Sequence, residues 1–308
     1  MERGIKADIL VCRTEHELSS DIRRKLAAFC NVKEEAVMQS IDASSIYEVP
    51  NNMLAEGLDR VALQKLDLPE KGLPDLTNWN NFLHKLKNPK ATVNIGLVGK
   101  YVELQDSYKS ILEAFVHAGA INQAKVNVVS IHSEYLTKEN TVDKLKNLDG
   151  ILVAPGFGSR GIEGKIETVR FARENNIPFM GICLGMQMAV IEYARNVLGY
   201  ANANSTEMND STPYPVITVM EEQKDIIDKG GTMRLGGWDC ELKEGTKIFD
   251  IYGKSLINER HRHRFEFNNY YVNEFEKSGL VLSGINPETK LVEAIEIEDH
   301  PFFVAVQY

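Results

Sequence analysis

The most informative motif lies at residues 178–185, which read PFMGICLG. The first half is a short apolar run typical of a buried strand, and apolar residues recur with helical spacing from about Gly185 to Leu198. Gly-x-Cys-x-Gly at such a junction is the pattern of a nucleophile elbow, with cysteine where serine is more familiar. The sequence therefore predicts a thiol, that of Cys183, at the carboxyl end of a sheet.

The residue types around Cys183 fit a covalent mechanism. Flanking glycines remove the Cβ clashes that a sharp strand-to-helix turn would otherwise create. The following helix is expected to lower the pKa of the thiol, and the Leu184 N–H to stabilise a developing oxyanion. Gly156-Phe157-Gly158 ends the preceding predicted strand and can supply a second donor. The alternative is a buried core cysteine, but the glycine turn favours a cysteine acyl-transfer site.

Strands and helices alternate on either side of this motif. We predict strands at residues 93–98, 126–131, 151–154 and 178–182, with helices between them. This order predicts an α/β fold with an open, mostly parallel sheet and helices on both faces. The later part is expected to be more antiparallel, with strands at 259–268, 280–284, 291–297 and 302–308.

The first ninety residues form a separate α/β segment. Strands are predicted near residues 8–12 and 36–40, and helices at 19–29 and within 44–66. Residues 67–91 contain three of the prolines that punctuate this region, which indicates an ordered linker around one amphipathic segment. The predicted organisation is a first segment at 1–66, a linker at 67–91 and a main domain at 92–308.

Composition excludes several classes of function. The 308 residues carry a net charge of −9, which disfavours a nucleic-acid partner. No run of 18 apolar residues and no signal peptide is present, so we expect no membrane association and a cytoplasmic location. The four cysteines form no CxxC pair, so we expect no metal site. Residues 96–101 resemble a phosphate loop only superficially and are interpreted as a strand-to-loop junction.

Two charged runs near the C-terminus need an interpretation. His261 and His263 alternate along a predicted strand, so both should face one side and the intervening arginines the other. We expect these basic residues to meet acidic ligands or an acidic partner surface. The acidic run at residues 293–299 is expected to be a solvated strand face.

Three longer motifs resemble the CTP synthase family, in which a synthetase domain precedes a class I glutamine amidotransferase domain. They are GICLGMQ at 181–187, NANSTE at 202–207 and ERHRHRFE at 259–266. The first ninety residues also resemble the closing part of that synthetase domain. The resemblance implies a sheet of the class I glutamine amidotransferase type, preceded by a partial α/β synthetase segment.

The resemblance also implies a reaction and a set of sites. Glutamine would be hydrolysed through a thioester on Cys183, and the ammonia would serve ATP-dependent amination of UTP to CTP. No cofactor is expected for this chain alone. The complete enzyme would use Mg and ATP, bind UTP or CTP and GTP, and form a homo-oligomer, a tetramer. The implied residues are Gly156 and Leu184 for the oxyanion; Gly156, Phe157, Leu184, Gly185, Met186, Gln187, Glu207 and Arg264 for glutamine; Lys25 for UTP or CTP; Ile41, Asp42 and Ala43 for ATP; and Arg160 for the GTP effector.

The chain departs from the family pattern in two places that affect activity. The family's phosphate loop and magnesium carboxylates would lie upstream of Met1, and the histidine and glutamate of its triad would follow Tyr308. His300 precedes the last predicted strand and should lie at the opposite end of it. We therefore expect a fragment with little activity. The alternatives are a non-catalytic glutamine-binding or assembly module, and another class I amidotransferase such as one serving GMP synthesis.

Overall fold

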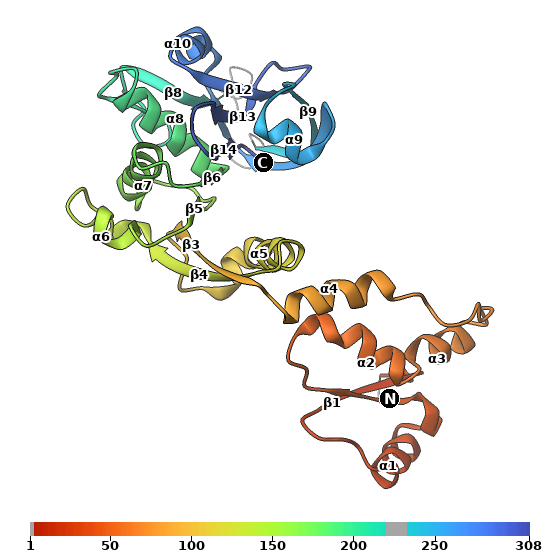
Figure 1. Ribbon diagram of the computed structural model, residues 1–308. Helices are drawn as coiled ribbons and strands as arrows, with labels where there is room; N and C mark the ends of the chain where they lie inside the picture. Colours follow the sequence, from red (N-terminus) through yellow and green to blue (C-terminus); the bar gives the residue numbers. More distant parts are fainter. Residues whose placement is uncertain (1–2, 220–232) are drawn as a thin grey trace. The chain divides into compact units, whose positions relative to one another are not determined.

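The computed structural model describes residues 3–219 and 233–308, and the chain divides into two compact units, Met1–Asn88 and Pro89–Tyr308 (Figure 1). The first unit contains the parallel strands β1 (Leu10–Thr14) and β2 (Val37–Ile41). Helix α1 (Ser20–Cys30) begins after Ser19, whose side chain accepts from the Ile22 N–H as an N-cap. The other helices of this unit are α2 (Val49–Ala55), α3 (Leu58–Lys65) and α4 (Thr77–Lys87).

The segment expected to link the two units packs on the first one. Helix α4 supplies Trp79, whose indole N–H donates to Tyr47 O at 2.9 Å. The rings of Tyr47, Trp79 and Phe82 also contact one another, with centroids 5.3–5.9 Å apart. These contacts explain why a proline-punctuated region is ordered.

The second unit is built on a sheet of nine strands, in the order β10-β9-β12-β13-β14-β6-β5-β3-β4. The strands from β14 to β4 are parallel, and those from β13 to β10 are antiparallel. The predicted open, largely parallel α/β sheet is thus confirmed. Their bounds are β3 (Ala91–Gly99), β4 (Ala124–His132), β5 (Gly150–Val153), β6 (Phe179–Ile182), β9 (Arg234–Leu242), β10 (Leu256–His263), β12 (Leu280–Ile285), β13 (Val292–Ile297) and β14 (Phe303–Val306).

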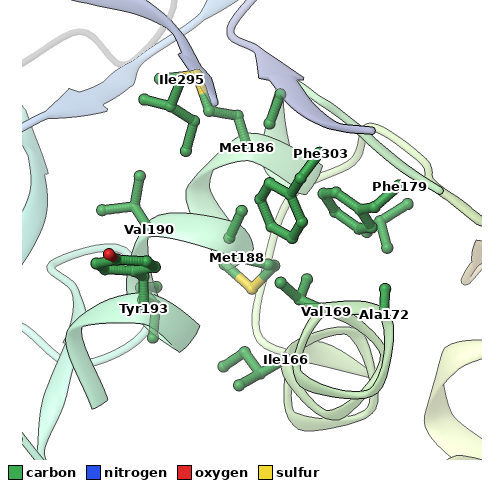
Figure 2. Close-up of a cluster of buried hydrophobic side chains, with 14 of the residues drawn as sticks. Ile166, Val169, Ala172, Phe179, Met186, Met188, Val190, Tyr193, Ile295 and Phe303 are labelled. Carbon is green, nitrogen blue, oxygen red and sulfur yellow. The ribbon is translucent and has the colours of Figure 1, made fainter. Parts of the chain in front are cut away.

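Helices cover both faces of the parallel strands. On one face, α7 (Ile162–Glu174) and α8 (Leu184–Asn196) form the main core with the sheet. Figure 2 shows this core, where Val169 of α7 and Met188 of α8 lie near Phe179 and Phe303. On the other face, α5 (Lys109–Ile121) packs over Leu97 and Leu152. Neighbouring strand residues therefore belong to different cores, as period-two alternation requires.

The strand predicted at 259–268 is in fact two strands in different sheets. Strand β10 ends at His263, and β11 (Phe265–Phe267) pairs with β8 (Tyr214–Val219) in a three-stranded sheet that also contains β7 (Ala203–Ser205). The break falls at Arg264, which the apolar pattern alone does not mark. The remaining helices are α6 (Thr141–Leu145), α9 (Lys247–Tyr252) and α10 (Val272–Lys277). No helix in the described part of the chain combines the length and apolarity needed to cross a membrane.

The expectation of a solvated face at residues 293–299 is wrong for Glu293 and Glu296, whereas Glu298 and Asp299 are exposed. Glu293 and Glu296 are 0% and 2% exposed. Glu293 lies 2.5 Å from Arg234 and 3.3 Å from His261, both buried. His261 and His263 do share one face of β10, as predicted, but it is the inner face, where they meet carboxylates of this chain rather than an external acidic partner.

Candidate active site

Four parallel strands deliver polar groups to one edge of the large sheet. Lys100 follows β3, Ala154 follows β5, Cys183 follows β6 and Gln307 follows β14. Carboxyl ends of parallel strands are where ligands bind in open α/β sheets. A cavity of about 1300 Å³ opens there, and its lining includes Cys183.

The backbone at Cys183 has the strain expected of a nucleophile elbow. Its φ of 51° and ψ of −104° are unusual for a residue with a side chain, and α8 begins at the next residue. The Cys183 N–H donates to Val306 O at 2.7 Å, which ties the elbow to β14. A Cβ added to Gly185 would lie 2.2 Å from Val153 O, so glycine is needed where α8 approaches β5.

The expected lowering of the thiol pKa is wrong for this structure. Burial raises the pKa of Cys183 to about 11. The Leu184 N–H and the charge of Lys165 act to lower that pKa, but removal from water outweighs both. Gln307 Nε2 donates to Cys183 Sγ at 3.6 Å, so the thiol already has a polar partner.

The turn after β5 is held from several directions. Lys165 Nζ donates to Ala154 O at 2.7 Å, and Lys100 Nζ donates to Phe157 O. The next peptide N–H, that of Gly158, donates to Glu207 Oε1 at 2.8 Å. The turn that carries Gly156 is therefore fixed by two buried ammonium groups and one carboxylate.

The structure brings most of the predicted glutamine-site residues together. Gly156, Phe157, Gln187, Glu207 and Arg264 line the same cavity as Cys183. Arg264 lines the cavity, and its buried Nε has no hydrogen-bond partner among the described residues.

Three other predicted residues of the site do not line the cavity. Leu184 and Met186 are buried in the main core, and Gly185 lies against the backbone of β5. Of these three residues, only Leu184 contacts Cys183 Sγ, through its backbone N–H.

Several residues of the site were not singled out by the sequence. Lys100 belonged to the glycine-lysine motif that was interpreted as a junction, and its position at the end of a buried strand was a usable signal. Lys165 gave no signal, because one lysine in a helical pattern normally faces water. The additional residues of the lining are Tyr101, Ser107, Tyr108, Pro155, Thr206, Thr218, Val219, Met233, Arg262, His263 and Phe265.

The predicted nucleotide-site residues are placed as follows. In the first unit, Lys25 is on exposed α1 with its side chain 80% accessible, and Asp42 follows β2 and pairs with Arg13 at 3.0 Å. Ile41 and Ala43 flank Asp42 in the chain. In the second unit, Arg160 pairs with Glu134 at 2.8 Å and lies 5.9 Å from the ring of Tyr101, which lines the cavity.

His300 lies at the far end of β14 from Cys183, as predicted. It precedes the strand, is buried, and its Nε2 is 3.1 Å from Ala172 O. Within residues 3–219 and 233–308, no imidazole is hydrogen bonded to Cys183 Sγ and no group of three or more His, Cys, Asp or Glu side chains is arranged to hold a metal ion.

Comparison with known proteins assigns the chain to a class. Residues 103–308 match the family Glutamine amidotransferase class-I, and residues 1–68 match the family CTP synthase N-terminus. The glutaminase domain of Trypanosoma brucei CTPS, solved with bound acivicin, is 37% identical with a TM-score of 0.66, covering 70% of this chain and 85% of that one.

Curated relatives match along the whole chain. It is 71% identical to the CTP synthase of Flavobacterium johnsoniae and 73% identical to that of Flavobacterium psychrophilum, over all 308 residues. The chain therefore belongs to the CTP synthase family. It spans 57% of the length of these two relatives.

Proposed function

We propose that the second unit hydrolyses glutamine at Cys183 and releases ammonia. The observation that carries this proposal is the strained elbow, which places one thiol in a cavity shared with Glu207 and Arg264. A carboxylate and a guanidinium are complementary to the α-ammonium and α-carboxylate of an amino acid. The side-chain amide would then extend toward the thiol.

The reaction has two covalent steps. The thiolate adds to the amide carbon, and the resulting oxyanion is stabilised by the backbone N–H of Leu184 and by the turn that carries Gly156. The carbon–nitrogen bond then breaks, ammonia leaves with an added proton, and a thioester remains. Water attacks the thioester, which gives glutamate and restores the thiol.

Ionisation of Cys183 limits this reaction. A pKa of about 11 leaves roughly one thiol in 10⁴ ionised at pH 7. The proton must pass to a base as the sulfur attacks, and the described residues offer no imidazole bonded to Sγ. We therefore expect slow turnover from the 308-residue chain by itself.

The complete reaction is a wider proposal that rests on the family. Ammonia from the second unit would replace an oxygen of UTP that ATP has activated, giving CTP. Lys25 would contact UTP or CTP, Ile41, Asp42 and Ala43 would lie near ATP, and Arg160 would respond to GTP. The proposed complete enzyme is a homotetramer. The described residues contain no cluster that fits Mg, so we assign no step of this chain to that ion.

Glutamate release from glutamine tests the proposal directly. The 308-residue chain and its Cys183→Ala variant would be compared with a chimera that adds the remaining segments of the Flavobacterium johnsoniae relative. We expect cysteine-dependent release that is much faster in the chimera. Glutamine or acivicin should also protect Cys183 from iodoacetamide in the short chain. Binding without release in either protein would support the non-catalytic module, and release that survives Cys183→Ala would refute the proposed nucleophile.

A further inference from the structure

Lys165 is a buried cation that the proposed reaction does not use. It lies on α7 among the residues of the main core, and its side chain is 1% exposed. Removing an ammonium group from water is costly unless the group is paired or hydrogen bonded. Among the residues that the structure describes, Lys165 Nζ has one hydrogen-bond partner, Ala154 O at 2.7 Å. Core packing alone would be better served by an apolar side chain.

The position of Nζ relates it to the turn that carries Gly156. A Cβ built on Gly156 would lie 3.8 Å from Lys165 Nζ and 3.9 Å from Lys100 Cε. Lys100, 7% exposed, holds the carbonyl of Phe157 in the same turn. Two lysines from different elements thus approach one short turn, and neither is among the residues that line the cavity.

The charge of Lys165 also acts on the nucleophile. The charged groups that affect Lys165 most are Lys100 and Cys183. Burial and the neighbouring charge of Lys100 lower the pKa of Lys165 to about 7. The Lys165 charge in turn lowers the pKa of Cys183, whereas Glu266 and Glu207 raise it. Buried Lys165 and the cavity-lining Cys183 therefore form a coupled pair, in which each charge favours the other.

We propose that Lys165 is a positioning residue of the cysteine site, which holds the oxyanion turn through Ala154 O and stabilises with its ammonium group the negative charge that develops at Cys183. The role in the reaction rests on the proposed glutaminase function. The electrostatic part does not, because it concerns only the ionisation of the thiol. A lysine that merely packs in the core would leave that ionisation unchanged.

The pH profile of Cys183 alkylation tests the pair without any turnover. Iodoacetamide reacts with the thiolate, and peptide mapping by mass spectrometry separates Cys183 from Cys12, Cys30 and Cys240. In the unmodified chain, the rate should rise tenfold per pH unit below about pH 7 and then flatten as Lys165 loses its proton. A profile that keeps rising tenfold per unit from pH 6 to 9 would overturn the proposal, and this measurement needs no variant.

Substitutions separate charge from hydrogen bonding. In Lys165→Met the flattening should disappear, and the rate at pH 6 should fall roughly tenfold. Lys165→Gln supplies a donor to Ala154 O but no charge. Its thermal stability should therefore be higher than that of Lys165→Met, whereas its pH profile of Cys183 alkylation should resemble that of Lys165→Met. Lys144→Met, on the exposed side of α6, is the matched control and should behave as the parent chain. Equal profiles in the parent and a folded Lys165→Met protein would refute the electrostatic role.

The glutaminase assay of the chimera then tests the link to the reaction. Lys165→Met should lower kcat about tenfold or more, with a smaller change in KM, because the charge acts as the sulfur attacks. A shifted alkylation profile with unchanged kcat would refute the catalytic contribution while leaving the charge coupling intact. If no glutamate forms in any protein, the proposed function fails and the alkylation result still decides the coupling.

Discussion

Glu207 Oε1 accepts a 2.8 Å hydrogen bond from the N–H of Gly158, a residue 49 positions earlier in the chain. The bond joins the segment after β7 to the turn after β5, and both segments contribute residues to the cavity lining. Glu207 can therefore have two roles. One oxygen fixes the turn, while the negative charge of the carboxylate remains available to an ammonium group. A carboxylate has lone pairs enough for both.

Two variants of Glu207 both remove its charge, and only one of them also removes the acceptor of the Gly158 N–H. Glu207→Gln keeps an oxygen for the Gly158 N–H but loses the charge, whereas Glu207→Ala loses both. We expect glutamine affinity to fall roughly 10- to 100-fold in each variant, because a charge-assisted bond to the ammonium group is lost. Protection of Cys183 from iodoacetamide by glutamine gives the dissociation constant without turnover. Unchanged protection in Glu207→Gln would show that the ammonium group binds elsewhere.

The elbow glycines support a prediction about stability. Alanine at Gly185 would place its Cβ 2.2 Å from Val153 O, and a backbone carbonyl in the middle of a sheet cannot move away. We expect Gly185→Ala to lower the free energy of unfolding by about 3 kcal/mol or more, measured by urea denaturation.

Gly156→Ala is the matched control for that substitution. The nearest atom to its added Cβ is Leu184 Cδ2 at 3.5 Å, an ordinary contact. Its free energy of unfolding should change by less than about 1 kcal/mol. Equal losses in the two variants would mean that close packing is not what requires glycine at residue 185.

The sequence was sufficient to predict the parallel half of the sheet and the elbow. Those elements depend on local patterns, namely apolar runs, helical spacing and the glycines around Cys183. The antiparallel half was harder to predict, because Glu293, Glu296, His261 and His263 break the apolar alternation while being buried. The partners of these four residues lie far away in the sequence. The local sequence pattern therefore predicts that the four side chains face solvent.

The raised thiol pKa was missed for a related reason. The helix that begins at Leu184 was visible in the sequence, and its N-terminus does favour a thiolate. The burial that opposes it arises only in the folded chain, where Cys183 contacts Val306 and Gln307 at the end of β14. The role of Lys165 could not be predicted for the same reason. Its partner is the backbone carbonyl of Ala154, and no residue type in the sequence indicates which carbonyl a lysine will contact.

The acidic run at residues 293–299 allows a buried carboxylate, Glu296, to be compared with an exposed one, Glu298. Glu296 accepts from the N–H groups of Lys247 and Ile248, at 2.8 and 2.9 Å, at the start of α9. Removing it leaves one buried and one partly buried donor unpaired, so Glu296→Ala should lower the free energy of unfolding by about 2–4 kcal/mol. Glu298→Ala, two residues along on the exposed part of the run, should change it by less than about 0.5 kcal/mol. Similar effects of both would contradict the buried capping role.

Glu266 is part of a buried group of charges that should make stability depend on pH. It lies 3.5 Å from Arg234 and 3.4 Å from His263, and Arg234 is also paired with Glu293. One guanidinium cannot balance two carboxylates, and burial together with Glu293 raises the pKa of Glu266 to about 8. Burial and the charges nearby lower the pKa of His263 to about 3, so that histidine is neutral in the folded chain above about that pH, and neutral in both states above pH 6.5.

These shifts give the sign of the pH dependence. The folded pKa of Glu266 is above the unfolded value of 4.5, so its contribution is fully present below pH 4.5 and is lost as the pH rises through 8. His263 contributes in the opposite sense, but only between pH 3 and 6.5, where the unfolded chain alone binds its proton. Between pH 6.5 and 8, a change in the free energy of unfolding with pH can therefore be assigned to Glu266 rather than to His263.

The comparison with Glu266→Gln isolates this contribution from other titrating groups. The free energy of unfolding of the parent chain should fall, relative to the variant, by about 1–2 kcal/mol between pH 6.5 and 8. Urea denaturation at several pH values measures both curves, and any effect of Lys165 cancels because both proteins contain it. Parallel curves would mean that Glu266 is already ionised at pH 6.5, held so by Arg234. A parent curve that rises relative to the variant would contradict the raised pKa of Glu266, because stability rises with pH only where the unfolded chain binds more protons than the folded chain.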